Sequence, residues 1–344
     1  MNALDHKCPT CSAKLPFNPK TQKWDCEYCA NSYTLEQLND FKEKQKQTSK
    51  NNELDVYRCP NCNANIITDK NTTATFCVYC GSTSIIKERL EGEFKPSKII
   101  PFKTTKEHAI KAFKQFKKGK IFAPNDFNNE ENIQKISGVY IPFWAYNCES
   151  QADLNFSAQN ISKWRRGNYR YTKTDYYSVN RSGNMKFDKV PVDGSRKFDD
   201  NTMDSIEPFI YEDLKEFNIS YLSGFFSEKY DVNIEEASIR AKERISNTVI
   251  DELKATVKNY STITLSTSNI DIETNESEYI LLPVWMLNIK YNGIPYLFAM
   301  NGQTGKMIGN IPIDNKKFFT TWIKKFAQFF LIISSIILIF ILLF

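Results

Sequence analysis

The chain has 344 residues, of which 41% are hydrophobic and 25% charged, so it suits a globular protein of two or three folding units and excludes a wholly disordered one. Forty-five Lys and Arg against forty Asp and Glu give a net charge of +5, which does not by itself indicate nucleic-acid binding. With His6 and His108 as the two histidines, a His-rich metal centre is excluded and a His-based catalytic triad is not expected.

One cysteine pattern occurs twice near the start of the chain. Each copy has two Cys-x-x-Cys pairs separated by 14 residues, and the copies are offset by 51 residues. Pairs at this spacing place four thiolates around one tetrahedral ion, and four cysteines leave no open coordination position. The sequence therefore predicts two structural Zn²⁺ ions, with rubredoxin-like iron or a thioredoxin-like redox pair as less favoured alternatives. The predicted ligands are Cys8, Cys11, Cys26, Cys29, Cys59, Cys62, Cys77 and Cys80.

The first seven residues lack the apolar stretch of a secretory signal peptide, so we expect the chain to begin in the cytosol, where metal binding is favoured over disulfides. We assign zinc ribbon 1 to residues 1–33, a helical and polar linker to 34–56 and zinc ribbon 2 to 57–86. A glycine after the second cysteine of each pair would relax the turn. The chain has Ser12, Ala30, Asn63 and Gly81 at these positions.

Three helices are predicted from capping patterns and apolar periodicity. The first begins at Thr34-Leu-Glu-Gln37 and runs to about Gln47. The second begins at Thr104-Thr-Lys-Glu107 and carries apolar residues on one face and lysines elsewhere. We expect this lysine-rich helix, residues 105–118, to dock on a core, although such a helix can also lie on anionic lipid. The third helix follows Asn233 and runs to about Lys258.

Strand formers dominate between these helices. We predict strands over 140–146 and 169–179, a turn at Arg181–Asn184 that leads into a strand over 185–192, and turns at Asn292-Gly293 and 301–306. Leu282–Asn288 repeats the pattern of Ile141–Asn147. Residues 87–313 are therefore predicted to form an α+β domain, and because no catalytic motif is found there we expect no enzyme.

Two features of this domain can be interpreted either as purely structural or as functional. Trp164–Tyr171 mixes aromatic residues with Arg, as RNA-binding sheets do, but cross-strand aromatic pairing explains the pattern as well and is favoured. The ninth cysteine, Cys148, is expected to be a small core residue rather than a reactive thiol.

The last part of the chain predicts a membrane anchor. Residues 326–344 carry no formal charge, and 19 helical residues span roughly 28 Å, close to the hydrocarbon thickness of a bilayer. A buried core helix is the alternative. Four lysines in a basic juxtamembrane segment, residues 314–325, precede this stretch, so the positive-inside rule predicts a single-pass cell-membrane protein with its N-terminal body in the cytoplasm.

An ordered set of motifs resembles the bacterial TFIIB-type zinc-ribbon, tail-anchored membrane proteins. The motifs are the Cys-Pro-x-Cys ribbons, Val190-Pro-Val-Asp-Gly-Ser195, Tyr221-Leu-Ser-Gly-Phe225, Leu282-Pro-Val-Trp285 and Asn301-Gly-Gln-Thr-Gly-Lys306. Members are often encoded beside phage-shock protein A homologues, TPM-domain membrane proteins and SPFH-related proteins. The resemblance implies a role in membrane stress, with the lipid bilayer and these proteins as partners.

The sequence thus predicts an α+β protein with two N-terminal zinc ribbons, a mixed α+β cytosolic region and one C-terminal transmembrane helix. As its function we expect an adaptor that recruits soluble partners to the cytoplasmic membrane face. The alternative is a membrane-tethered zinc-ribbon protein that binds nucleic acid, with the lysine-rich helix and the Trp164–Tyr171 cluster assisting.

Overall fold

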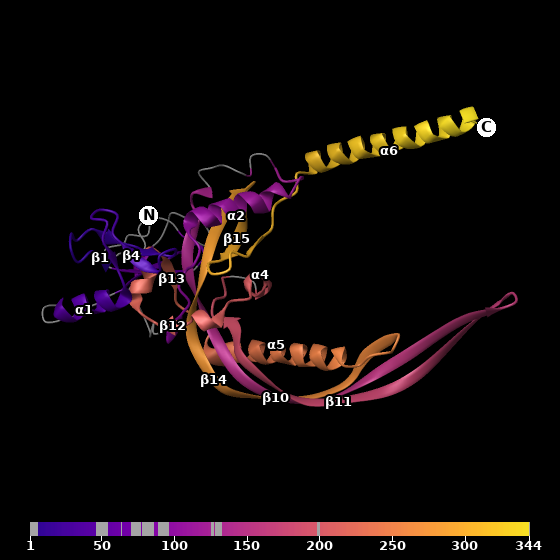
Figure 1. Cartoon of the computed structure of the whole chain (residues 1–344), viewed down its shortest axis with the longest axis horizontal. Helices are drawn as coiled ribbons and strands as arrows, with labels where there is room; N and C mark the ends of the chain where they lie inside the picture. Colours follow the sequence, from indigo (N-terminus) through magenta and orange to yellow (C-terminus); the bar gives the residue numbers. More distant parts are fainter. Residues whose placement is uncertain are drawn as a thin grey trace.

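The computed structural model describes residues 6–45, 54–62, 64–69, 77, 86–88, 96–124, 127, 133–197 and 200–343. Long β-strands dominate these residues, and three of them curve away from a compact base (Figure 1). The predicted α+β class is therefore wrong, because strands that we expected to be short and separated by turns instead run on for 25 to 30 residues.

The central strand is β10 (Ser137–Arg166), which lies between β11 (Tyr169–Asp193) and β14 (Thr262–Tyr291). Both neighbours are antiparallel to it. Its pairing with β14 runs from Ser137 opposite Met286 to Gln159 opposite Thr262. Its pairing with β11 continues further, to Arg166 opposite Tyr169. Beyond Gln159 the sheet therefore narrows from three strands to two.

Short strands widen the sheet at its base. β9 and β13 are parallel to β14 and β10 respectively, and β15 and β16 continue the antiparallel order beyond β14. Their bounds are β9 Lys98–Ile99, β12 Lys215–Glu216, β13 Phe226–Glu228, β15 Ile294–Asn301 and β16 Met307–Gly309. The expected Asn292-Gly293 turn joins β14 to β15, and both residues have positive φ (51° and 81°), as a two-residue hairpin requires.

Helix α5 (Ile234–Ala255) lies in the hollow of the curved strands (Figure 1). It begins where predicted, because the Asn233 side chain accepts a 2.8 Å hydrogen bond from the Glu236 amide. Its buried stripe has residues four apart, which are Ala237, Ala241, Ile245, Val249 and Leu253. The stripe belongs to the same core as the inward residues of β10, Ala152, Leu154, Phe156 and Ala158, so α5 closes the inner face of the sheet.

The other helices are shorter or project from the body. Helix α2 (Lys106–Lys118) docks through Phe113, whose ring lies 4.9 Å from that of Phe298, so the docked interpretation of the lysine-rich helix is confirmed. The remaining helical elements are α1 Leu35–Gln45, α4 Asp200–Ile206, η1 Tyr211–Asp213, η2 Ile219–Leu222 and α6 Asn315–Leu343. The predicted capping box of α1 is present, with the Thr34 amide donating to Gln37 Oε1 over 2.9 Å.

One predicted turn is wrong. β11 passes through Arg181–Asn184 without interruption, because each of these residues pairs with β10. The chain instead reverses at residues 167–168, where Gly167 has a φ of 61°. Gly183 is expected in a turn, but its φ is not positive. A Cβ atom at this position would lie 3.6 Å from the Leu253 side chain of α5, an ordinary van der Waals contact.

The C-terminal prediction is also wrong. Helix α6 forms and extends away from the base (Figure 1), but in the described part of the chain no helix is both long and apolar enough to cross a bilayer. The side chains of residues 336–344 lie outside the described ones. The predictions of a transmembrane helix over 326–344, a tail anchor and a single-pass membrane location are therefore corrected.

Candidate metal centres

Two tight turns of the same kind present the cysteines of ribbon 1. In the first, the Cys8 amide donates to the Ala13 carbonyl over 2.7 Å, and the Ser12 amide donates to the Cys8 carbonyl over 2.8 Å. In the second, the Cys26 amide donates to the Asn31 carbonyl over 2.8 Å, and the Ala30 amide donates to the Cys26 carbonyl over 2.9 Å. The residue after the second cysteine is left-handed in both turns, with φ of 59° at Ser12 and 57° at Ala30. This conformation explains why glycine is expected there.

The turns bring four sulfur atoms together from distant parts of the ribbon. The Sγ atoms of Cys8, Cys11, Cys26 and Cys29 all lie within 4.8 Å of one another. Cys8 Sγ is 3.5 Å from Cys29 Sγ, and Cys11 Sγ is 3.5 Å from Cys26 Sγ. A tetrahedral ion with metal–sulfur bonds near 2.3 Å sets its ligands roughly 3.8 Å apart. The four sulfurs therefore fit one metal ion, as predicted, although the arrangement does not identify the metal.

The electrostatics of the cluster also favour a cation. Burial opposes ionisation of Cys8, but hydrogen bonds from the Tyr33 hydroxyl and the Cys11 amide outweigh it and lower the pKa of Cys8 to about 6. A hydrogen bond from the Ala13 amide favours the Cys11 thiolate, but burial and the neighbouring sulfurs outweigh it and raise the pKa of Cys11 to about 12. Four thiolates so close together repel one another, so a bound cation is needed to ionise all of them.

Ribbon 2 repeats this arrangement as far as the structure describes it. The sulfur atoms of Cys59, Cys62 and Cys77 form a second cluster within the same 4.8 Å limit. The Cys59 amide donates to the Ala64 carbonyl over 2.9 Å, the counterpart of the Cys8 bond to Ala13. Cys80, the predicted fourth ligand, lies outside the described residues. Three sulfurs that already converge can hold a second metal ion.

The strands of the two ribbons are short, and each ribbon meets the body differently. Ribbon 2 joins the main sheet, because β7 pairs with β13. Ribbon 1 has its own small sheets and docks on η2 instead. The ribbon strands are β1 His6–Lys7, β2 Lys14–Leu15, β3 Phe17–Asn18, β4 Lys23–Asp25, β5 Ser32–Tyr33, β6 Leu54–Arg58, β7 Asn65–Asp69 and β8 Ile86–Glu88.

Ribbon 1 docks through aromatic rings and backbone hydrogen bonds. The rings of Phe17 and Trp24 lie 5.5 and 5.3 Å from that of Tyr221 on η2. The Phe17 amide donates to the Ser223 carbonyl over 3.1 Å, and the Ser223 hydroxyl donates to the Leu15 carbonyl over 3.0 Å. The sequence predicts no role for the motif Tyr221–Phe225. In the structure, this motif provides the surface on which ribbon 1 packs.

A relative of known sequence aligns with almost the whole chain. It is a Bacillus subtilis (strain 168) protein with the name "Uncharacterized protein YdjG", which is 36% identical over 314 residues, 91% of this chain and 92% of the relative. The chain belongs to the YdjG family. No model of a known protein family matches it, and no solved structure does.

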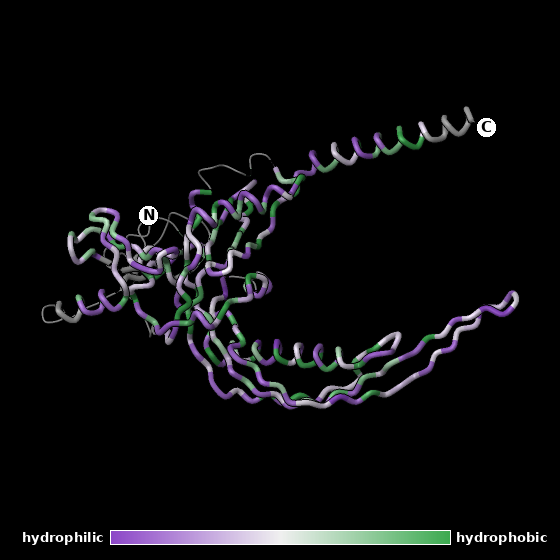
Figure 2. The backbone as a smooth tube through the Cα atoms, in the orientation of Figure 1, coloured by the Kyte–Doolittle hydropathy of each residue, from purple (hydrophilic) through white to green (hydrophobic). Residues whose placement is uncertain are grey.

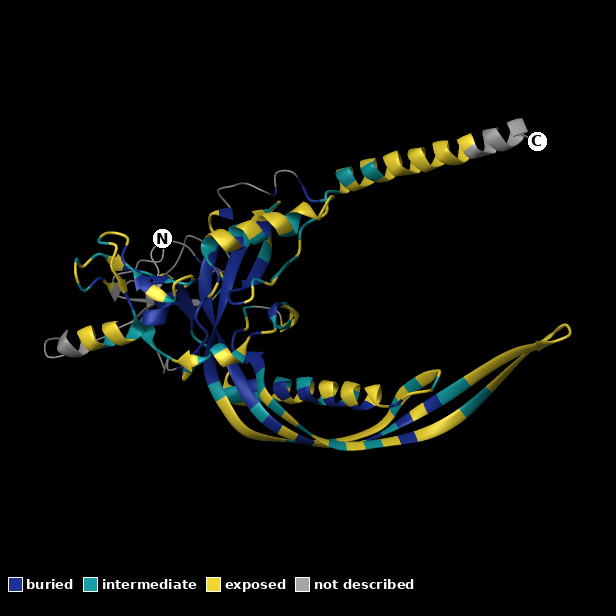
Figure 3. Ribbon diagram, in the orientation of Figure 1, coloured by how far each residue is buried: buried dark blue, intermediate teal, exposed yellow. Residues whose placement is uncertain are grey.

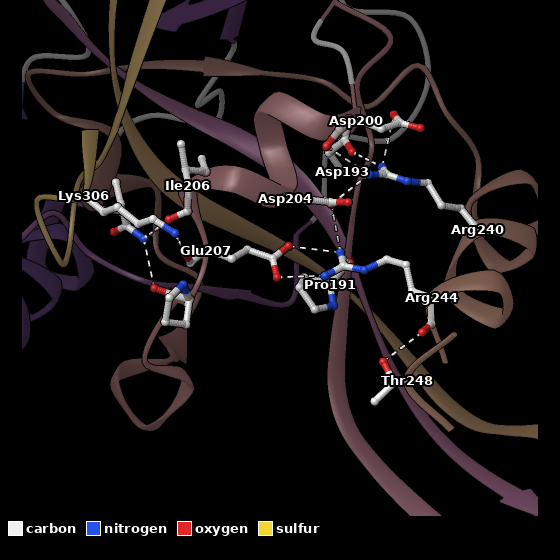
Figure 4. A network of polar contacts seen from close by, with 12 residues as sticks. Pro191, Asp193, Asp200, Asp204, Ile206, Glu207, Arg240, Arg244, Thr248 and Lys306 are labelled. Atoms are coloured by element: carbon white, nitrogen blue, oxygen red, sulfur yellow. Dashed lines mark hydrogen bonds and ion pairs between the residues drawn. The ribbon is translucent and has the colours of Figure 1, made fainter. Parts of the chain in front are cut away.

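A partly buried ionic cluster beside α5, which the sequence did not predict, links this helix to neighbouring segments (Figure 4). Arg240 on α5 lies 2.5 Å from Asp193 at the end of β11 and 2.8 Å from Asp204 on α4. One turn later, Arg244 lies 3.1 Å from Asp204 and 2.9 Å from Glu207. Two arginines four apart on one helix are a usable sequence signal, but their carboxylate partners come from separate segments that only the fold brings together.

Burial dominates the protonation of this cluster. Asp193 is nearly inaccessible to solvent, and its burial raises its pKa to about 6 although Arg240 and its hydrogen bond act in the opposite direction. Burial likewise raises the pKa of Glu207. The cluster ties α4 and the end of β11 to α5, so it positions the helix in the hollow of the sheet.

Proposed function

We propose that this YdjG-family protein is a non-enzymatic adaptor that binds other proteins through the metal-shaped surface of ribbon 1. The observation that supports this proposal most is the pairing of a closed four-sulfur cluster with a ribbon seated firmly on the body. A closed cluster has no coordination position for a substrate, so its metal would serve to shape the ribbon. The docked ribbon then presents a rigid surface at no further ordering cost.

The surface has two parts. Tyr28, in the second cysteine turn, is 83% exposed although it is a large aromatic residue. Beside this turn, a groove of about 510 Å³ lies between ribbon 1 and the base of the sheet. Phe225 and Trp285 are among its apolar lining residues. An exposed aromatic residue next to a groove with apolar lining residues is typical of protein-binding surfaces.

The charge of the groove indicates what it would bind. Asp25, Glu27 and Glu107 line it with one cation, Lys106. Burial alone would raise the pKa of Asp25, but hydrogen bonds from Ser32 and other neighbours outweigh the effect of burial, so the pKa is lowered. A hydrogen bond from Thr105 lowers the pKa of Glu107. A partner segment with apolar side chains flanked by basic residues would complement this groove.

We propose partners of the classes that the sequence resemblance implies: phage-shock protein A-like and SPFH-related soluble proteins and a TPM-domain membrane protein, in a membrane-stress response. The adaptor role proposed here does not include the transmembrane anchor that the sequence had suggested. The ribbon surface would supply the contacts, and several weak contacts on one rigid ribbon suffice for an adaptor.

Site-specific photo-crosslinking in the full-length protein tests this function. A benzophenone amino acid in place of Tyr28 is expected to give adducts with proteins of these classes. The matched control carries the same group in place of Ile239, which is 72% exposed on α5. Adducts should be absent from the control and weakened by Glu27→Lys, but not by Asp40→Lys on α1. Identical adducts from both positions, or none from position 28, would refute the proposal.

A further inference from the structure

The far end of the β10–β11 hairpin is a separate structural feature with no role in the adaptor function. We define the arm as residues 160–177, where β10 pairs with β11 alone because β14 begins opposite Gln159. The arm extends past α5 (Figure 1), and most of its residues are exposed (Figure 3). A two-stranded ribbon without a packed face is marginally stable on its own, so its side chains are free to serve another purpose.

The arm concentrates charge. It carries five cations, Lys163, Arg165, Arg166, Arg170 and Lys173, against one carboxylate, Asp175. Asp175 lies 3.0 Å from Lys173 and neutralises it. The whole chain has a net charge of only +5, so most of that excess is on this arm. Figure 2 shows the hydrophilic character of its tip.

The arm also concentrates exposed aromatic rings. Tyr169 is 73% exposed and Tyr176 72% exposed. Trp164 and Tyr171 pair across the strands, with ring centroids 5.6 Å apart and ring planes within 10° of parallel, yet each remains more than 40% exposed. The predicted cross-strand pairing is therefore confirmed and accounts for two of the five aromatic residues. The ring of a third, Tyr177, lies 5.2 Å from that of Tyr260.

The register assigns these residues to faces. Trp164 shares the inner face with the buried Phe156 and Ala158, because side chains alternate along β10. The inner face of the arm thus continues the strip that α5 covers and presents Trp164, Tyr171, Arg166, Tyr169, Lys173 and Tyr177. The outer face presents Lys163, Arg165, Arg170 and Tyr176. Each face therefore carries cations and at least one ring, and most of the rings lie on the inner face, which also carries Asp175.

We propose that the arm binds nucleic acid, with unpaired bases stacking on its exposed aromatic rings and the phosphate backbone contacting its arginines and lysines. A single strand offers both a flat π-face and a negative charge in every nucleotide, so it matches a surface that carries exposed rings and cations together. An acidic protein would pair with the cations but would leave Tyr169 and Tyr176 without a matching surface.

The arrangement of the tip argues against an anionic membrane. A segment that inserts into lipid has apolar residues at its extremity and cations behind them. Here the extremity is Arg165-Arg166-Gly167-Asn168, so the most distant residues are the most polar. A second copy of the chain is another anionic surface that the arm could bind, because Asp153, Asp271 and Glu273 lie on the outer face of the sheet. These carboxylates, however, offer no surface on which the rings of the arm could stack.

Fluorescence anisotropy with the full-length protein and labelled 20-nucleotide single-stranded RNA, single-stranded DNA and duplex DNA tests this proposal. We expect single strands to bind more tightly than the duplex, with affinity that falls as salt rises. Arg165→Gln with Arg170→Gln should weaken binding and reduce the salt slope by about 1.4 for a single strand. Tyr169→Ala with Tyr176→Ala should weaken binding about tenfold or more with little change in the slope.

The matched control is Lys111→Gln with Lys118→Gln, which removes two exposed cations from α2 and should leave binding unchanged. Circular dichroism of each variant confirms that the fold persists. Absence of oligonucleotide binding at low salt, or an equal loss in the α2 control, overturns the proposal. So does arm-dependent sedimentation with anionic vesicles, or arm-dependent self-association, in place of oligonucleotide binding.

Discussion

The indole nitrogen of Trp24 donates a 2.8 Å hydrogen bond to the backbone carbonyl of Ser220, 196 residues later in the chain. Trp24 is 1% exposed, so a residue of ribbon 1 is part of the core of the body. Ribbon 1 is therefore not a module on a tether. Its metal, its strands and η2 should respond to mutation as one unit.

The first prediction concerns this contact. Trp24→Phe removes the hydrogen bond and keeps most of the apolar contact, so the free energy of unfolding should fall by about 1 kcal/mol, plus the cost of lost ring volume. Trp24→Ala should cost roughly 3–5 kcal/mol. Urea unfolding measures both. As a control, Trp164→Phe on the exposed arm should change stability by no more than about 0.5 kcal/mol. Equal effects at both tryptophans would contradict the docking.

The second prediction concerns metal content. The full-length protein should carry two metal ions per chain, measured by elemental analysis, because each ribbon supplies its own sulfur cluster. Cys8→Ser with Cys26→Ser should leave one, and Cys148→Ser should leave two, since Cys148 is buried in the sheet with its sulfur 3.7 Å from the Thr274 hydroxyl. Two ions remaining after the loss of Cys8 and Cys26 would show that ribbon 1 is not a metal site.

The third prediction uses the left-handed turn residue of ribbon 1. Ala30 has a φ of 57°, a conformation that costs a non-glycine residue roughly 1–2 kcal/mol. Ala30→Gly should therefore raise stability. The net gain should be about 1 kcal/mol, because the entropy that glycine adds to the unfolded chain offsets part of the relieved strain. Ala13→Gly, at a position without positive φ, should instead lower it. Thermal unfolding of the metal-loaded protein distinguishes the two signs, and a destabilising Ala30→Gly would contradict the turn geometry.

The fourth prediction follows from the raised pKa of Asp193, about 6 in the folded protein against 3.8 ordinarily. Between these values the folded state holds a proton that the unfolded state has lost. The contribution of Asp193 to stability is therefore largest at low pH and declines as pH rises from about 4 to above 6, by at most about 3 kcal/mol.

Asp193→Asn should remove this decline. As pH rises through that range, the free energy of unfolding of the wild type should therefore fall relative to that of the variant. Urea unfolding at pH 4, 5, 6 and 7 measures it. Asp153→Asn, at an exposed aspartate on the outer face of the sheet, is the matched control and should keep the wild-type slope. A constant difference between wild type and Asp193→Asn would show that the carboxylate ionises normally.

Several local features of this protein could be predicted from short sequence patterns. The spacing of Cys8 to Cys29 determined the four-sulfur cluster, because two short turns need only a few residues each. Asn233 and the four-residue period after it determined α5, and Asn292-Gly293 determined a hairpin turn, since caps and two-residue turns are formed by adjacent residues.

The tertiary structure decided what depends on distant partners. Gly183 is expected in a turn, yet its pairing with Ala152 continues β11 through this position. Uncharged residues near the C-terminus indicate a bilayer span, but no helix in the described part of the chain is both long and apolar enough to cross a bilayer. Arg240 and Asp193 form an ion pair because the fold packs α5 against the end of β11. The arm is exposed because α5 does not extend far enough along β10 to cover it. Periodicity reports which residues share a face, and only packing decides what covers that face.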